Sequence, residues 1–103
     1  MKRSFIIYTY NSQKYIGNLI DSLMEQIQDN EQIVIVDDMS EDNTVPIIVE
    51  KIGYFFTDED HYKLYINSTK KGKKDSVAMA KKIATGDFKF IINKKGRIKV
   101  WYN

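Results

Sequence analysis

The chain has 103 residues, 43% of them hydrophobic and 29% charged, which is typical of a globular protein and predicts one domain over residues 1–103. It contains no cysteine, which excludes disulfides and thiolate metal sites, and its net charge of +2 is too small to indicate nucleic-acid binding by itself. No apolar run approaches the roughly 18 residues that span a bilayer, so we expect no membrane span. The absence of cysteine fits a cytoplasmic protein, which we expect.

The first part of the chain alternates between strand and helix signals. Residues 4–8 form an apolar run that predicts a buried strand. The pair Asn11-Ser12 then predicts a turn and a helix cap. Residues 13–28 carry apolar side chains at three- and four-residue spacing, which predicts a helix with one apolar face. A second apolar run at residues 32–36, rich in β-branched side chains, predicts another strand.

Two adjacent carboxylates, Asp37 and Asp38, end the second predicted strand. A short polar turn follows, and residues 44–52 predict a helix that Gly53 would end. In an open α/β sheet, ligands bind outside the carboxyl ends of the strands. Carboxylates placed there can accept hydrogen bonds from a ribose or a base.

The second part of the chain continues the alternation after an ambiguous aromatic and acidic stretch at 54–62, which predicts a loop or an irregular helix end. The remaining expected elements are a strand at 63–67, a lysine-rich loop at 68–74, a helix at 75–84, a strand at 88–92, a hairpin turn at 93–96 and a strand at 97–102. This order predicts an α/β fold with a mostly parallel sheet, helices on both faces and a final hairpin.

Charge is distributed unevenly along the chain. Residues 16–60 are rich in Asp and Glu, whereas the chain from Lys63 onward is rich in Lys. If both parts contribute to one sheet, acidic strand ends would face a basic loop, which suits a ligand with a phosphate end. The alternative is ordinary solvated surface charge, and the sequence leaves both open.

Four segments of the chain carry a family resemblance. They are the strand and turn at 5–11, the helix at 15–28, the stretch at 36–44 and the Ala-Thr-Gly-Asp-Phe run at 84–88. In this order they resemble the nucleotide-binding half of family 2 glycosyltransferases of the GT-A (Rossmann-like) fold. In the first segment, Tyr8 stands where the family has proline. The third, Val-Asp-Asp-Met-Ser-Glu-Asp-Asn-Thr, is close to the family's Val-Asp-Asp-Gly-Ser-Thr-Asp-Gly-Thr.

The resemblance implies a site for a UDP-type nucleotide sugar, with the Thr9-Tyr10 region and Asp37 holding the uracil and ribose. The chemistry is reasonable, because a carboxylate accepts a hydrogen bond from the uracil N–H and an aromatic ring packs on the base. Asp38 and Asn11 are further candidates. Each has a plain alternative: Asp38 can cap the next helix, Asn11 can serve as a turn residue, and Tyr10 can simply pack.

The family's Asp-x-Asp metal motif would fall directly after the strand at 88–92, where this chain has Asn93-Lys94-Lys95. Divalent cations such as Mg²⁺ prefer oxygen ligands, of which Asn93 offers one neutral atom and Lys95 none. We therefore expect no divalent-metal site of the usual kind. Lys95 could instead neutralise a diphosphate directly, or the lysines could be solvated in a polar turn.

Two further departures concern catalysis. Val77 and Ala78 stand where the family has Arg and Asn, and no carboxylate follows Asp87 that could serve as the general base. The resemblance thus covers a truncated half without the acceptor part, and the sequence leaves open whether the chain is complete. The single histidine, His61, has no Cys or second His as a metal partner, so we expect a surface role for it.

Three functions remain open. The first is a glycosyltransferase-like protein that binds a nucleotide sugar, degenerate or independent of metal. The second is a non-catalytic binding or regulatory module that acts through a protein partner. The third, which we favour least, is nucleic-acid binding through the lysine-rich face. An apolar stretch at residues 98–102, at a sheet edge, is also compatible with a homodimer.

Overall fold

The computed structural model describes residues 2–28, 30–55, 61–92 and 98–101. Their strands form one five-stranded sheet in the order β3-β2-β1-β4-β5. The strands are β1 (Arg3–Thr9), β2 (Gln32–Asp37), β3 (Tyr62–Ile66), β4 (Phe88–Ile92) and β5 (Ile98–Trp101), and the helices are α1 (Ile16–Gln26), α2 (Thr44–Phe55) and α3 (Lys73–Ile83).

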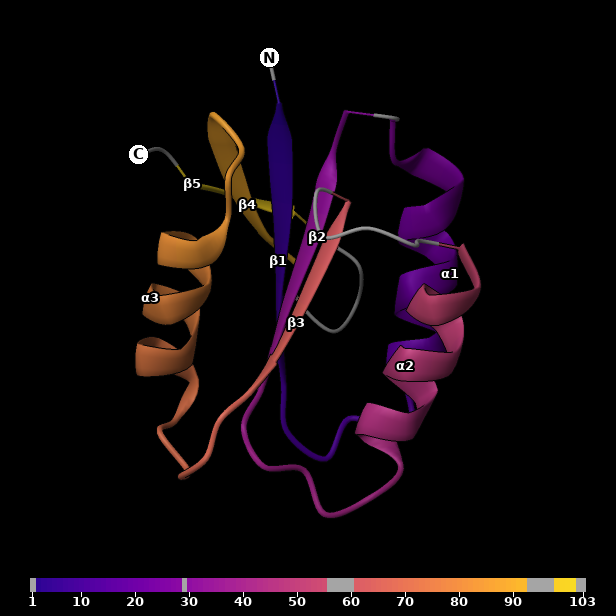
Figure 1. Cartoon of the computed structure of the whole chain (residues 1–103), viewed down its shortest axis with the longest axis vertical. Helices are drawn as coiled ribbons and strands as arrows, with labels where there is room; N and C mark the ends of the chain where they lie inside the picture. The colour runs from indigo at the N-terminus through magenta and orange to yellow at the C-terminus, as the bar shows by residue number, and fades with distance from the viewer. Residues whose placement is uncertain (1, 29, 56–60, 93–97, 102–103) are drawn as a thin grey trace.

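The first four strands are parallel, and β5 is antiparallel to β4. Helices α1 and α2 cover one face of the sheet and α3 covers the other (Figure 1). The predicted α/β fold, with a mostly parallel sheet between helices, is therefore confirmed. Among the described helices, none has the length and apolar character needed to cross a membrane.

The core follows from the apolar runs of the two central strands. Every residue of β2 is buried, as expected for a strand covered on both faces. Successive side chains alternate between the two faces of the sheet. Ile33 and Ile35 pack toward α1 and α2, whereas Val34 and Val36 pack toward α3.

Two helices differ from the predicted bounds. Helix α1 begins at Ile16 rather than at residue 13, because the Ser12 carbonyl accepts hydrogen bonds from the Tyr15 and Ile16 amides and forms a turn first. No side chain caps this helix, so the predicted Asn11-Ser12 cap is wrong. Helix α2 continues through Gly53 to Phe55. The buried packing of Ile52 outweighs the helix cost of glycine, about 1 kcal/mol.

The later elements agree with the prediction to within two residues. Strand β3 begins one residue earlier than expected and α3 two residues earlier, at Lys73, directly after Gly72 in a left-handed conformation (φ 84°). Strand β4 has the predicted bounds. The predicted hairpin turn at 93–96, and most of the ambiguous stretch at 54–62, lie outside the described residues.

A polar network joins the α3–β4 turn to the amino end of the sheet. The Gly86 amide donates to the Ser4 Oγ (2.8 Å), which in turn donates to the Gln32 Oε1 (2.8 Å). The Thr85 amide also donates to the Gln32 Oε1 (3.0 Å). All three strands β1, β2 and β4 are thus tied together where the chain enters β4.

We expect Gly86→Ala to destabilise the fold by about 1–3 kcal/mol, because it overpacks this junction. A Cβ at position 86 would lie 2.5 Å from the Ser4 Oγ and 2.7 Å from its backbone nitrogen. Gly53→Ala is the matched control, since a Cβ there meets no atom within 4 Å. In an exposed helical position it should stabilise by roughly 0.5–1 kcal/mol. Urea unfolding followed by circular dichroism measures both; equal stability of the two variants would contradict the expectation.

Candidate functional site

The carboxyl ends of β1 and β2 lie side by side, with Thr9 directly opposite Asp37 in the parallel register. The loops that follow them lie at the lower end of the molecule in Figure 1. Both candidate segments from the sequence therefore meet at one edge of the sheet.

The two loops are held together by hydrogen bonds. Asn11, in a left-handed conformation (φ 46°), donates its amide to the Ser40 Oγ (2.8 Å) and accepts from the Glu41 amide through Oδ1 (2.8 Å). The Gln13 amide donates to the Asp42 Oδ2 (3.2 Å). Asn11 is exposed, and its side chain serves the loop geometry.

Asp37 is fully buried and holds the end of β2. Its Oδ1 accepts from the Thr9 hydroxyl and from the Ser40 hydroxyl, each at 2.6 Å. Its Oδ2 accepts from the Ser40 amide at 2.8 Å. The three donors come from the end of β1 and the turn after β2, so this carboxylate braces the turn.

Asp38 is also fully buried, and four donors surround its carboxylate. Oδ1 accepts from the Asn67 Nδ2 (3.0 Å) and the Lys71 amide (2.8 Å), and Oδ2 from the Tyr8 hydroxyl (2.9 Å) and the Gly72 amide (2.9 Å). Burial raises the pKa of this carboxyl, but the hydrogen bonds to its charged form outweigh burial and bring the pKa down to about 2. Asp38 is therefore ionised at neutral pH, and it does not cap α2.

Tyr8 stays protonated beside this charge. Burial and the hydrogen bond to Asp38 raise the pKa of the Tyr8 phenol to about 12. A proline, expected here from the resemblance noted in the sequence, offers no hydroxyl to donate. The departure at Tyr8 thus supplies one of the four donors to Asp38.

Tyr10 lies half-exposed just beyond Thr9, and Lys70 covers one face of its ring. The Lys70 Nζ is 2.9 Å from the ring centroid, within the range of cation–π contacts. The structure thus brings together Thr9, Asp37 and Asp38, with Tyr10 beside them. Lys95 and Asn93 lie outside the described residues.

Sequence reasoning did not identify these contributors to the site: Ser40, Asn67, Lys70, Lys71 and Gly72. Backbone amides of the β3–α3 loop reach Asp38, and no residue type marks a backbone donor. The glycine among lysines at 70–74 was the available signal, since Gly72 adopts φ 84°, a conformation disfavoured for other residues.

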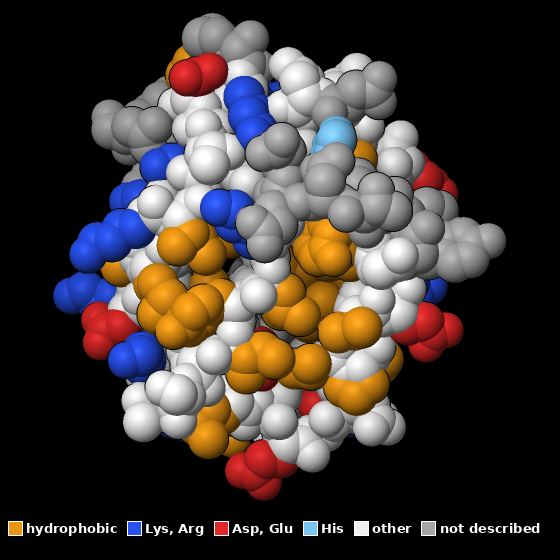
Figure 2. Space-filling model, viewed as in Figure 1, with side chains coloured by type: hydrophobic (Ala, Val, Ile, Leu, Met, Phe, Trp, Pro, Cys, Tyr) orange, Lys and Arg blue, Asp and Glu red, His pale blue; other side chains and the backbone are white. Residues whose placement is uncertain are grey.

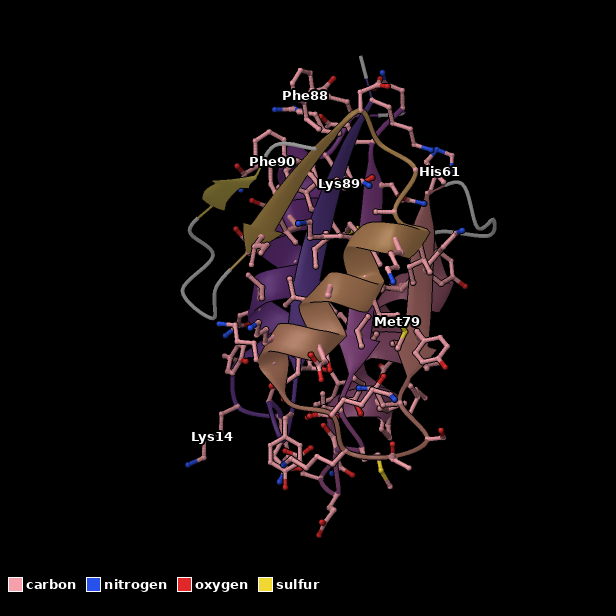
Figure 3. All side chains as sticks on the ribbon, turned by 90° about the vertical axis from the view of Figure 1, so that its left-hand side faces the viewer. Lys14, His61, Met79, Phe88, Lys89 and Phe90 are labelled. Carbon is pink, nitrogen blue, oxygen red and sulfur yellow. The ribbon has the colours of Figure 1, made fainter. Side chains whose placement is uncertain are left out.

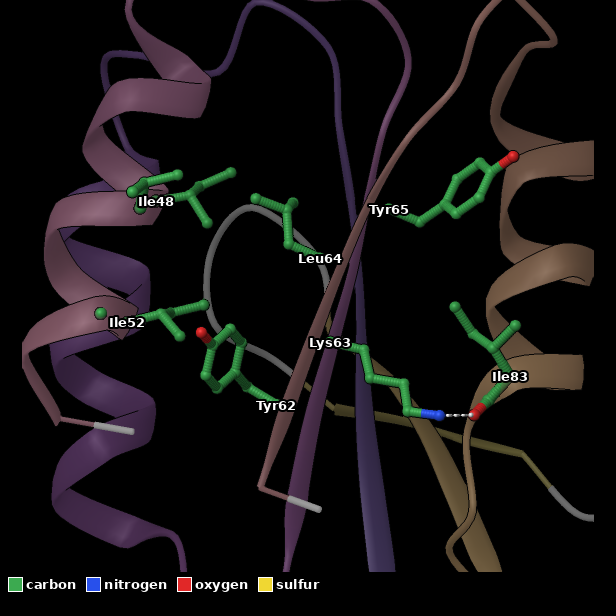
Figure 4. Close-up of a pocket in the computed structure, with 9 residues that line it drawn as sticks. Ile48, Ile52, Tyr62, Lys63, Leu64, Tyr65 and Ile83 are labelled. Carbon is green, nitrogen blue, oxygen red and sulfur yellow. Dashed lines mark hydrogen bonds between the residues drawn. The ribbon is translucent and has the colours of Figure 1, made fainter. Parts of the chain in front are cut away.

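A hollow of about 530 Å³ lies elsewhere, along the β3 edge between α2 and α3. Hydrophobic side chains gather on this face of the molecule (Figure 2). Among the described residues that line it, one is charged: Lys63, whose Nζ donates to the Ile83 carbonyl at 3.4 Å (Figure 4). The hollow is separate from the ends of β1 and β2, where the candidate side chains lie.

His61 is remote from the candidate site. Figure 3 shows it at the end of the sheet opposite Lys14, which follows the carboxyl end of β1. Within the described residues, no group of three or more His, Cys, Asp or Glu side chains is placed to hold a metal ion.

Comparison with known proteins gives consistent similarities. The family model described as Glycosyl transferase family 2 matches residues 4–94. The poly(ribitol-phosphate) beta-N-acetylglucosaminyltransferase TarS of Staphylococcus aureus is 39% identical over 98 residues, which cover 90% of this chain and 16% of TarS. The chain thus spans about one sixth of the length of this relative.

Solved structures agree. The mannosyltransferase PcManGT of Pyrobaculum calidifontis, in complex with GDP-Man and Mn²⁺, has a TM-score of 0.79 and 25% identity, covering 89% of this chain and 27% of that one. S. aureus TarS 1–349 in complex with UDP-GlcNAc has a TM-score of 0.71 and 36% identity, covering 91% and 26%.

The buried Asp38 predicts a defined acid sensitivity. Its pKa in the folded state, about 2, lies below its ordinary value of 3.8, so the unfolded chain binds this proton first. The stabilisation is therefore complete above about pH 4 and is lost as the pH falls toward 2. We expect the free energy of unfolding of Asp38→Asn to lie below that of the wild type at pH 7, and the difference to narrow between pH 4 and pH 2.

Urea unfolding at several pH values measures this difference. Glu25→Gln, on the exposed face of α1, is the control and should follow the wild type throughout. The pKa of Asp42 is also lowered, because hydrogen bonds from Thr44 and Gln13 outweigh its desolvation. Asp42 is present in both proteins, so its contribution to the pH dependence of stability is common to the wild type and Asp38→Asn. A constant difference between wild type and Asp38→Asn across the acid range would refute the assignment.

Proposed function

The chain belongs to glycosyl transferase family 2, and on that premise we propose that it binds the nucleotide part of a UDP-type nucleotide sugar at the carboxyl ends of β1 and β2. The observation that carries this proposal is that consecutive residues contact the Tyr10 ring, through the Lys70 ammonium, and the buried Asp38 carboxylate, through the Lys71 amide, which places the ring near Asp38. Structures of TarS in complex with UDP and with UDP-GlcNAc support a uridine nucleotide.

The hydrogen bonds suggest different roles for the two carboxylates. Asp37 is bound by Thr9 and Ser40 at the strand ends, so its removal would release the turn itself. Two donors to Asp38 come instead from the amides of an exposed loop. We therefore assign Asp38 as the acceptor of the base N–H, Tyr10 as the stacking ring, and Thr9 with Asp37 as the support on the ribose side.

We propose further that this binding does not require a divalent metal. The residues at the expected metal motif, Asn93 and Lys95, supply one neutral oxygen and a cation, and this donor set does not fit Mg²⁺ or Mn²⁺. Lys95 is then available to neutralise the diphosphate. No Asp or Glu follows Asp87 in these 103 residues. We therefore assign to these residues the binding of the nucleotide-sugar donor and derive no transfer step.

Replacing the stacking ring tests the proposal. We expect Tyr10→Leu to weaken UDP binding about 5- to 150-fold, since stacking of a base on an aromatic side chain contributes about 1–3 kcal/mol. Tyr65→Leu is the matched control, because Tyr65 is exposed on β3 and lines the other hollow. Isothermal titration calorimetry gives both affinities. UDP binding that is equal in all three proteins would exclude this site, and no binding to the wild type would exclude the function.

The metal proposal has a separate test. The affinity of the wild type for UDP should be the same in EDTA and in millimolar Mn²⁺, because Asn93 and Lys95 offer no carboxylate pair at the expected metal motif. The double variant Asn93→Asp/Lys95→Asp, which restores the family motif, should bind UDP more tightly with Mn²⁺ than without it. Wild-type binding that depends on Mn²⁺ would show that other ligands hold a metal.

A further inference from the structure

The loop between β3 and α3 lies over both groups that a base would contact. The Lys70 ammonium sits 2.9 Å from the centroid of the Tyr10 ring. The next two residues, Lys71 and Gly72, donate their amides to the two oxygens of Asp38, at 2.8 and 2.9 Å. One three-residue segment therefore covers the ring and the carboxylate together.

This arrangement conflicts with base binding at the same place. A base that stacks on Tyr10 and donates to Asp38 must lie between them, where the ammonium and the loop backbone now are. A carboxylate accepts about four hydrogen bonds, and Asp38 already accepts four, from Tyr8, Asn67, Lys71 and Gly72. An incoming N–H thus finds no free acceptor position while the loop amides remain.

We propose that the segment at 68–72 is a latch that occupies the base site in the unliganded protein and opens when a uracil-type base binds. This inference rests on the proposed function. Opening exchanges the Lys71 and Gly72 amides for the base N–H at Asp38, and exchanges the Lys70 ammonium for the base on the Tyr10 ring. In the open state the carboxylate still accepts from Tyr8, from Asn67 and from the base N–H, three donors in place of four.

The ends of the segment suit such a movement. Asn67 anchors one end, because its amide donates to the Asp37 carbonyl (2.9 Å) and its Nδ2 to the Ser76 Oγ (2.9 Å). Gly72 forms the other end, with a φ of 84° and no Cβ to restrict a change of conformation. Between them, the residues at 68–71 are exposed and bury no apolar side chain.

The closed state also leaves a polar atom unsatisfied. Asn67 is buried, and its Oδ1 has no hydrogen-bond partner among the described residues, although its backbone amide and its Nδ2 are both bonded. Opening of the latch would let water reach this atom, which lowers the free-energy cost of leaving the closed state. The affinity for a nucleotide is reduced by the fraction of closed protein.

Removing the Lys70 side chain tests the latch. An exposed cation–π contact contributes about 0.5–1 kcal/mol, so Lys70→Ala should bind uridine about two- to fivefold more tightly than the wild type. Uridine is the probe because it is uncharged, and loss of a lysine therefore does not weaken its attraction. Lys73→Ala removes the same charge from the exposed start of α3 and should leave the affinity unchanged. Titrations followed by nuclear magnetic resonance give the three dissociation constants.

Hydrogen exchange of the backbone amides provides a second measurement. The Lys71 and Gly72 amides should be protected in the free wild type and lose protection with saturating UDP, while the Asn67 amide stays protected. Protection that persists in the UDP complex, or uridine affinity that is unchanged or weaker in Lys70→Ala, would overturn the latch and leave the nucleotide site standing. Absence of binding of uridine and UDP to both the wild type and Lys70→Ala would overturn the proposed function and the latch together.

Discussion

The buried charge of Asp38 sets the constraint on which the carboxyl edge of the sheet depends. A carboxylate excluded from solvent is tolerated only where donors replace its hydration. Here the donors come from β1, from the residue after β3 and from the β3–α3 loop. The side chain therefore couples the end of β2 to β1 and to the connection between β3 and α3, which are far apart in the sequence. It also explains why an exposed, lysine-rich loop lies over the sheet edge at all.

A second polar network works at the opposite end of the sheet. Ser4, Gln32 and Gly86 connect β1, β2 and the entry to β4, and an ion pair between Arg3 and Glu31 lies nearby. Between these two ends, the buried side chains of β1 and β2 are apolar. The apolar side chains make up most of the buried core, whereas the polar networks determine how the loops are attached to the strand ends.

The sequence predicts the strands well because buried runs such as 32–36 have few alternatives. It also predicts that Thr9, Asp37 and Asp38 end neighbouring strands. It does not predict their separate roles, which follow from the alternation of side chains across the sheet. Asp37 lies on the same side as Thr9, toward α1 and α2, and Asp38 on the same side as Tyr8, toward α3. The start of α1 was missed because a backbone carbonyl, which has no residue signature, forms the preceding turn.

The contact of Gly86 with Ser4 has a consequence beyond stability. It fixes the register in which β4 pairs with β1, so that the last residue of β4, Ile92, lies opposite Ile7. A shift of one residue would move Phe90 and Ile92 from the α1–α2 face of the sheet to the α3 face and Ile91 the other way, and the packed neighbours on both faces oppose it. The register of this strand is thus specified at its beginning, independently of the residues beyond its end. Substitutions directly after Ile92, such as those at the expected Asp-x-Asp position, therefore leave intact the contacts that set the pairing of β4 with β1.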